Sequence, residues 1–267
     1  MSQISLHHWR EPLSARTLAL AFLSTSGTRP MRAAALIRRA EICGVDGPAM
    51  RMALGRLVRE CVVEQVERGV YAIGREGQAL NRVARGWAEA EARVRPWAGR
   101  WIVVAVDHLG RSDRRQVRAQ ERALRLNGVA RSDSGLWVRP DNLALSLDDF
   151  AARLIGLGLD ATATILGDAQ ASATQDGAFR ALWPAAAIAA RYRHWIDEMA
   201  ASEDRLASMT IVEAARETLL LGQSVIRTIN TDPLLPAEMV DAALRAEMIA
   251  AMRRYDTIGK GFWAKVE

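Results

Sequence analysis

The segment from Met31 to Ile73 constrains the fold most, because its periodicity changes from helical to strand-like within about forty residues. The pattern predicts a helix from Met31 to Ile42 and a turn containing Gly44, Asp46 and Gly47. A second helix is expected from Pro48 to Arg59, since proline is tolerated in the first turn of a helix. Its apolar positions recur at helical spacing and predict one buried stripe: Ala49, Met50, Ala53, Leu54, Leu57 and Val58.

Two short β-branched runs follow this second helix. Val62 to Val66 and Val70 to Ile73 are separated by Glu67-Arg68-Gly69, with the glycine where a tight hairpin turn needs one. Two helices joined by a turn and followed by a hairpin with a basic tip are typical of a winged helix-turn-helix. We therefore expect residues 1–80 to form a DNA-binding domain.

The chemistry of the second helix agrees with this expectation. Guanine offers two acceptors in the major groove that an arginine fork can bridge, and a small residue such as Gly55 allows close approach. The alternative is that these arginines only solvate an amphipathic surface helix. The candidate DNA-binding residues are Pro48, Arg51, Met52, Gly55, Arg56, Arg59 and, at the hairpin tip, Arg68.

Length and composition suit a multidomain, water-soluble α+β protein. The 267 residues suffice for two or three cores, no apolar run of eighteen residues occurs, and the N-terminus lacks the pattern of a secretory signal. Cys43 and Cys61 have no metal-ligand spacing, and both are expected to be buried thiols in a reducing cytoplasm. We expect a cytoplasmic protein with no membrane association, no metal and no cofactor.

The distribution of charge predicts where a polyanion would bind. The net charge of +5 divides into +4 for residues 1–80, +4 for residues 81–165 and −3 for residues 166–267. The basic excess is therefore confined to the first two thirds of the chain, which favours a nucleic-acid partner for that part.

The rest of the chain predicts three further segments. Residues 81–96 are expected to form a helical connector, and residues 169–267 an all-helical effector and dimerisation domain in which one helix opens at Pro236. Residues 97–168 follow the order strand, helix, two strands, helix, strand, which is that of a ferredoxin-like sheet with both helices on one face. The expected elements are 101–107, 113–126, 129–131, 136–139, 147–156 and 162–166.

Several motifs along the chain resemble those of one regulator family. They are Ala35-Leu-Ile37, the run from Ala49 to Glu60, Gly69-Val-Tyr71, WAGRW from Trp97, RALRLNGVARSDSGLWVRP from Arg122, and DPLLP from Asp232. Together they resemble the PaaX-like repressors, which regulate phenylacetic acid catabolism and related aromatic pathways. The resemblance implies a homodimeric repressor that binds a double-stranded operator and is released by an acyl-coenzyme A effector. The residues implied for the major groove are Arg51, Met52, Gly55, Arg56 and Arg59.

Two departures from the family pattern concern the effector and the operator. The family usually follows its DPLLP-like break with a stretch bearing proline and tryptophan, whereas this chain has AEMVDAALRAE. The hairpin tip keeps only Arg68, where the family more often has two basic residues.

An enzymatic alternative is a metal-dependent nuclease built on the central sheet. Asp107 ends the first strand of that sheet, as an aspartate does in small ferredoxin-like nucleases of CRISPR systems; otherwise Asp107 caps the following loop. No nucleophile elbow or phosphate-cradling glycine loop occurs, so we expect no catalytic residues. His7, His8, His108 and His194 have no partner at metal-ligand spacing.

Two sets of residues are candidates for a role in effector binding. Trp183, Trp195 and Trp263 are expected to fill the core of the helical segment, or one of them to line an effector pocket. The second set contains Arg139, Arg191 and Arg193, which are candidates for contacts with the phosphates of a coenzyme A effector. The alternative is that these arginines are solvated or form ion pairs within the protein.

Overall fold

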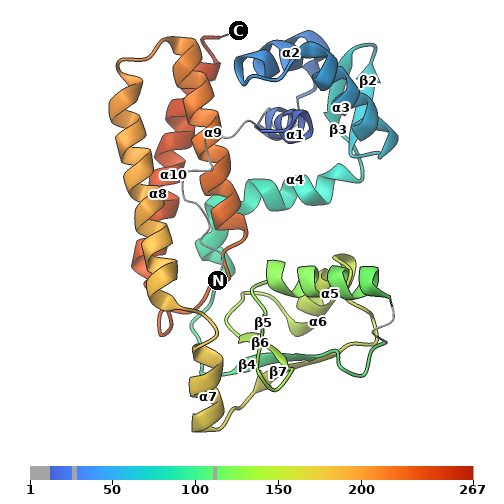
Figure 1. The fold of residues 1–267 in the computed structure, drawn as a ribbon, viewed down its shortest axis with the longest axis vertical. Helices are drawn as coiled ribbons and strands as arrows, with labels where there is room; N and C mark the ends of the chain where they lie inside the picture. Colours follow the sequence, from blue (N-terminus) through green and yellow to red (C-terminus); the bar gives the residue numbers. More distant parts are fainter. Residues whose placement is uncertain (1–12, 26–28, 111–112, 267) are drawn as a thin grey trace. The chain divides into compact units, whose positions relative to one another are not determined.

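The computed structural model describes residues 13–25, 29–110 and 113–266 as a mixed α+β chain with two small antiparallel sheets (Figure 1). Its contacts divide the chain into two compact units. Unit 1 combines Met1–Ala88, Trp195–Asn230 and Ile249–Glu267, and unit 2 combines Glu89–His194 and Thr231–Met248. The division into four consecutive domains that we expect from the sequence stays a prediction. Each of the two units instead combines stretches that are distant in sequence.

The first part of unit 1 has the element order helix, strand, two helices and a hairpin. The elements are α1 (Ala15–Thr25), β1 (Met31–Arg32), α2 (Ala33–Ile42), α3 (Gly47–Arg59), β2 (Val63–Glu67) and β3 (Val70–Ile73). Met31 was expected to begin a helix, which is wrong because Met31 and Arg32 pair with Tyr71 and Val70 of β3. That pairing is a long-range contact which the local periodicity does not report.

Helix α3 begins where its capping residues place it. The side chain of Asp46 accepts a hydrogen bond of 2.7 Å from the backbone N–H of Ala49, and Pro48 occupies the first turn. Met50, Leu54 and Leu57 are buried in a core shared with α1 and α2, as the stripe predicted. One side of α3 is therefore fixed by packing.

The sheet of unit 1 has the order β1-β3-β2, and β2 pairs with β3 as an antiparallel hairpin. Gly69 has φ +74°, a left-handed conformation that glycine adopts without strain. Glu67 pairs with Val70, so Arg68 and Gly69 form the tip of the hairpin. The strand expected to begin at Val62 begins at Val63.

The predicted connector consists of two helical pieces, α4 (Gly77–Arg85) and the 3-10 segment η2 (Gly86–Arg93). Within unit 1, the Nδ2 of Asn230 donates to the carbonyl of Ala84 over 3.3 Å, and a guanidinium N–H of Arg253 donates to the carbonyl of Ala88. Helix α4 is therefore held by late segments of the chain.

Three long helices complete the chain: α8 (Ala185–Leu206), α9 (Ile211–Asn230) and α10 (Ala242–Trp263). In unit 1, a Cβ on Gly259 would lie 3.1 Å from the side chain of Thr218, so this glycine allows α9 and α10 to approach closely. The expectation that α10 opens at Pro236 is wrong. The helix begins at Ala242, where the side chain of Asp241 accepts from the N–H of Leu244 over 2.9 Å.

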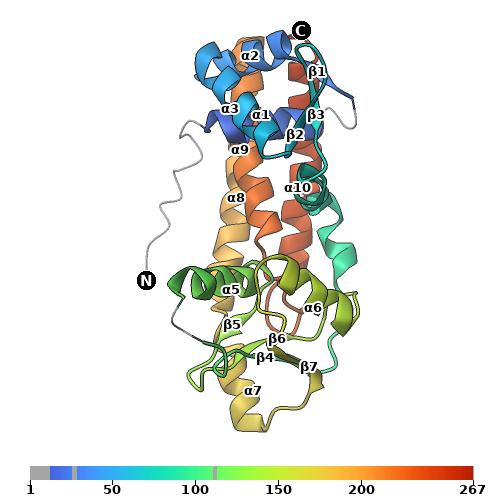
Figure 2. The same cartoon turned by 90° about the vertical axis from the view of Figure 1, so that its right-hand side faces the viewer.

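Unit 2 contains the second sheet, formed by β4 (Trp101–Ala105), β5 (Ala130–Arg131), β6 (Trp137–Pro140) and β7 (Thr164–Ala169). Its order is β5-β6-β4-β7, and every neighbouring pair is antiparallel. Helices α5 (Arg114–Leu126) and α6 (Leu147–Gly156) lie on the same side of this sheet (Figures 1 and 2). Phe179 of α7 (Ala173–Arg180) packs against Trp101 and Val138.

Asp232-Pro-Leu-Leu-Pro236 is a structural junction inside unit 2. The carboxylate of Asp232 accepts from the hydroxyl of Tyr192 over 2.6 Å and from the N–H of Leu234 over 2.8 Å. The carbonyl of Leu234 in turn accepts from Nδ2 of Asn142 over 2.7 Å. This buried polar network explains the motif without any ligand. Among the described residues, no helix has both the length and the apolar character required to cross a membrane.

Candidate nucleic-acid interface

The outer side of α3 is open to solvent along the whole helix. Six of the seven predicted DNA-binding residues lie on it, and all six are exposed: Pro48, Arg51, Met52, Gly55, Arg56 and Arg59. We call this set the α3 face. Met52 is 61% exposed, although a large apolar side chain gains free energy from burial.

Two features of the α3 face suit close approach by a negatively charged surface. A Cβ added to Gly55 would meet no atom within 4 Å, so a partner can reach the helix backbone there. Among the described residues, Arg51, Arg56 and Arg59 form no ion pair within 4 Å. Positive charge is therefore free to meet phosphates or base edges.

The seventh predicted residue, Arg68, is exposed at the tip of the β2–β3 hairpin. The same hairpin exposes the acidic side chains of Glu64 and Glu67, so its charge is mixed. The hairpin therefore offers one cation at its tip and not a continuous basic surface.

Helix α5 of unit 2 carries a second basic surface that the sequence analysis did not single out. Its members are exposed arginines, which we call the α5 stripe: Arg114, Arg115, Arg118, Arg122 and Arg125. At about 100° per residue they fall within an arc of about 100°. Four of them, with Ala119, line a shallow surface hollow. Glu121 pairs with Arg125 over 3.1 Å, which neutralises one member of the stripe. The helical spacing of these arginines in the sequence could have predicted the stripe.

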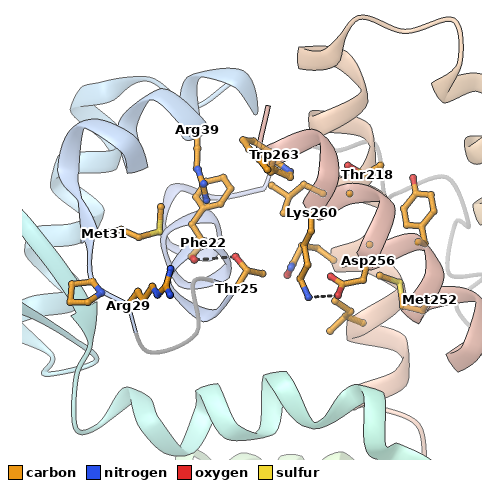
Figure 3. Close-up of a pocket in the computed structure, with 18 residues that line it drawn as sticks. Phe22, Thr25, Arg29, Met31, Arg39, Thr218, Met252, Asp256, Lys260 and Trp263 are labelled. Atoms are coloured by element: carbon orange, nitrogen blue, oxygen red, sulfur yellow. Dashed lines mark hydrogen bonds and ion pairs between the residues drawn. The ribbon is translucent and has the colours of Figure 1, made fainter. Parts of the chain in front are cut away.

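Unit 1 also contains a cavity of about 450 Å³ that is open to solvent, with α1 and α2 on one side and α9 and α10 on the other (Figure 3). Trp263 of α10 lines it and meets Phe22 of α1 edge to face, with ring centroids 5.3 Å apart. Trp263, one of the three tryptophans considered for an effector pocket, therefore lines this cavity, and its role in effector binding stays a prediction. Trp195 is buried, whereas Trp183 stacks on Trp101 of the second sheet instead of filling a helical core.

The two cysteines differ, although both were expected to be buried. Cys43 is buried, and its burial raises the pKa of the thiol to about 12. Cys61 is exposed because it follows the end of α3 with φ +55°, a turn geometry that takes its side chain out of the core. The prediction for Cys61 was wrong.

The arginines considered for phosphate binding have different environments. Arg139 is only 1% exposed and donates to the carbonyl of Asn127 over 2.5 Å and to Oδ1 of Asn142 over 3.1 Å, so it is a structural residue. Burial lowers the pKa of its guanidinium. Arg191 lies 3.9 Å from the buried carboxylate of Asp232, and Arg193 is exposed.

The nuclease alternative depends on Asp107 and the residues around it. Asp107 is exposed and lies 3.8 Å from Arg131. Within residues 13–25, 29–110 and 113–266, no three His, Cys, Asp or Glu side chains gather where a metal ion could be held. His108 contacts the carbonyl of Thr162 at 3.0 Å, and His7 and His8 lie outside the described residues.

Comparison with known proteins supports the fold alone. No protein-family model and no curated protein matches the sequence. Among solved structures, an uncharacterized protein from Mycobacterium tuberculosis, Rv0674, is similar, with a TM-score of 0.66 and 24% sequence identity. The match covers 95% of this chain and 98% of that chain, so the similarity extends over both units.

Proposed function

We propose that this chain is a sequence-specific DNA-binding transcriptional regulator, a repressor of the PaaX-like type, that reads the major groove with α3. The observation that carries the proposal is the α3 face, where arginines, a bare glycine and an apolar side chain are exposed opposite the buried side chains of Met50, Leu54 and Leu57. That combination suits a helix inserted in a groove, because the buried side holds the helix while the outer side remains free to contact bases.

The order of elements in unit 1 supports interpreting its first part as a winged helix-turn-helix. Helices α2 and α3 are joined by a short turn, and the β2–β3 hairpin follows as the wing. In this interpretation Arg68 contacts the sugar-phosphate backbone beside the site that α3 reads. The strand order β5-β6-β4-β7 likewise supports a ferredoxin-like interpretation of the second sheet.

The α5 stripe gives the same partner a second contact. Four arginines that form no ion pair with any described residue lie on one side of this helix, and they attract a polyanion whatever its sequence. We infer that the α3 face supplies specificity, while the α5 stripe adds affinity through phosphates. A homodimer on a near-palindromic site follows from the family resemblance and is part of the proposal.

Selection from a random duplex library with the full-length chain tests the proposal. We expect one enriched sequence, bound in preference to a scrambled duplex in fluorescence anisotropy. The Arg56→Ala variant should then lose about 1–3 kcal/mol of binding to the enriched duplex, with little change on the scrambled duplex.

Arg254→Ala is the matched control, since Arg254 is exposed on α10 and outside the α3 face. It should leave both affinities unchanged. A library without enrichment, or an Arg56→Ala variant that weakens both duplexes equally, would remove the assignment of α3 as the reading helix.

A further inference from the structure

Met52 projects from α3 on the side opposite the protein core. At about 100° per residue, the buried side chains of α3 lie between about 140° and 200° around the helix from Met52. They are Met50, Leu54 and Leu57. Packing of these three side chains fixes the direction in which Met52 points. Met52 therefore leads α3 into any groove that the helix enters with its outer side.

The surroundings of Met52 leave it open to a partner with negative charge. Gly55 follows it by three residues and Arg56 by four, so both lie on the same side of the helix as Met52. A Cβ added to Gly55 would meet no atom within 4 Å, and the side chain of Arg56 is exposed. A polyanion can therefore approach α3 closely enough to cover the thioether of Met52.

The exposure of Met52 is unusual within this protein. At 61%, it has the largest exposed fraction of the large apolar side chains that the described part of the chain leaves in solvent. Such a side chain gains free energy when an apolar group covers it, and a flexible thioether adapts well to small apolar surfaces. Met52 is therefore suited to contact an apolar group on the partner of the α3 face.

The major groove of DNA offers such a group on one base. Thymine presents its 5-methyl group there, whereas guanine, adenine and cytosine present hydrogen-bond donors and acceptors. A thioether has no donor and is only a weak acceptor, so it gains little from the polar base edges. The chemistry of the groove therefore matches Met52 to thymine and not to the other three bases.

We propose that Met52 selects thymine through its 5-methyl group, at a position within two base pairs of a guanine that Arg56 contacts. This inference deepens the proposed function and rests on it. Met52 and Arg56 are separated by four residues, which is about 6 Å along the helix axis. Base pairs are stacked about 3.4 Å apart, so the two side chains reach positions one or two base pairs apart.

Replacement of single thymines by deoxyuridine in the enriched duplex tests this inference, because deoxyuridine differs only by the missing methyl group. Binding of the full-length chain is measured by fluorescence anisotropy. We expect one position near a guanine in each half-site at which the replacement weakens binding about fourfold, as for one buried methyl group. Unchanged affinity after every replacement would overturn the inference and would leave the proposed function standing.

Two substitutions of Met52 identify the side chain that detects the methyl group. Met52→Gln keeps the length of the side chain but makes its end polar, and it should abolish the difference between thymine and deoxyuridine. Met52→Leu keeps an apolar side chain and should retain most of that difference. Methionine, leucine and glutamine have similar helix propensities, so neither change should disturb α3. A deoxyuridine penalty that is the same in the Met52→Gln variant would show that another residue reads the thymine.

The matched control is Ile211→Ala, because Ile211 is also apolar and exposed but lies at the start of α9, outside the α3 face. This variant should keep the full deoxyuridine penalty. Size-exclusion chromatography tests a second copy of the chain as the alternative partner of Met52. If Met52→Gln abolishes self-association and leaves the deoxyuridine penalty unchanged, the inference is overturned. If the library yields no enriched duplex, the proposed function fails, and the inference fails with it.

Discussion

Single residues in this chain repeatedly combine burial with a polar group that has one specific partner. Tyr255 of α10 is an example in unit 1: its hydroxyl lies 2.6 Å from that of Ser202, and Glu217 and Arg205 are nearby. Burial raises the pKa of this phenol well above its ordinary value. The folded chain therefore keeps the phenolic proton at a pH at which the unfolded chain has released it.

This difference makes stability depend on pH in a definite direction. Above about pH 10 the unfolded chain binds fewer protons than the folded chain, so the free energy of unfolding should fall as pH rises. We expect Tyr255→Phe to flatten that decline by up to about 1.4 kcal/mol per pH unit, as measured by urea unfolding between pH 9 and 11. Tyr71→Phe is the control, because Tyr71 is only half-buried. A slope that Tyr255→Phe does not alter would contradict this explanation.

Among the elements, those governed by local rules were predictable from the sequence. The buried stripe of α3 and the span of α6 from Leu147 to Gly156 agree with expectation, because helical periodicity and capping residues are encoded in neighbouring positions. The exposure of every predicted α3 residue follows from the same periodicity.

Elements governed by distant contacts were not predictable in this way. β1 exists because Met31 and Arg32 pair with a strand some forty residues later, and α10 starts late because 232–236 belongs to a buried network. The cavity could not be foreseen either, since Phe22 and Trp263 lie at opposite ends of the sequence. Tertiary packing brings such residues together without leaving a local signal.

The α5 stripe leads to a prediction at the scale of an element. Replacing Arg114, Arg118 and Arg122 together by glutamine should weaken binding to all duplexes alike, because phosphates carry no sequence information. The slope of log affinity against log salt concentration should fall by about 0.9 for each phosphate that the variant no longer neutralises. Arg193 and Arg254, changed together to glutamine, control for the loss of two of these three positive charges. An unchanged slope in the α5 variant would show that α5 does not touch DNA.

For the whole molecule, the important fact is that unit 1 is assembled from three separate stretches of chain. Leu219 and Trp263 pack against the core formed by α1, α2 and α3. The segment that carries the α3 face therefore packs against residues that lie far along the chain.

Truncation tests this dependence. A chain ending at Met248 lacks most of α10, and we expect faster amide hydrogen exchange in α1 and α3, because Trp263 no longer supports them. A chain ending at Ala264 retains Trp263 and should exchange like the full-length protein. Equal protection of α1 and α3 in both truncated chains would show that the N-terminal segment is stable without α10.

The different surroundings of the two thiols have a practical consequence. A maleimide dye added to the unaltered protein should attach only to Cys61, since the other sulfur is shielded from solvent. Cys61 follows directly after α3, so the fluorophore would sit beside the surface that is expected to meet the duplex. The natural sequence thus supplies a site-specific optical reporter of target engagement without any engineered substitution.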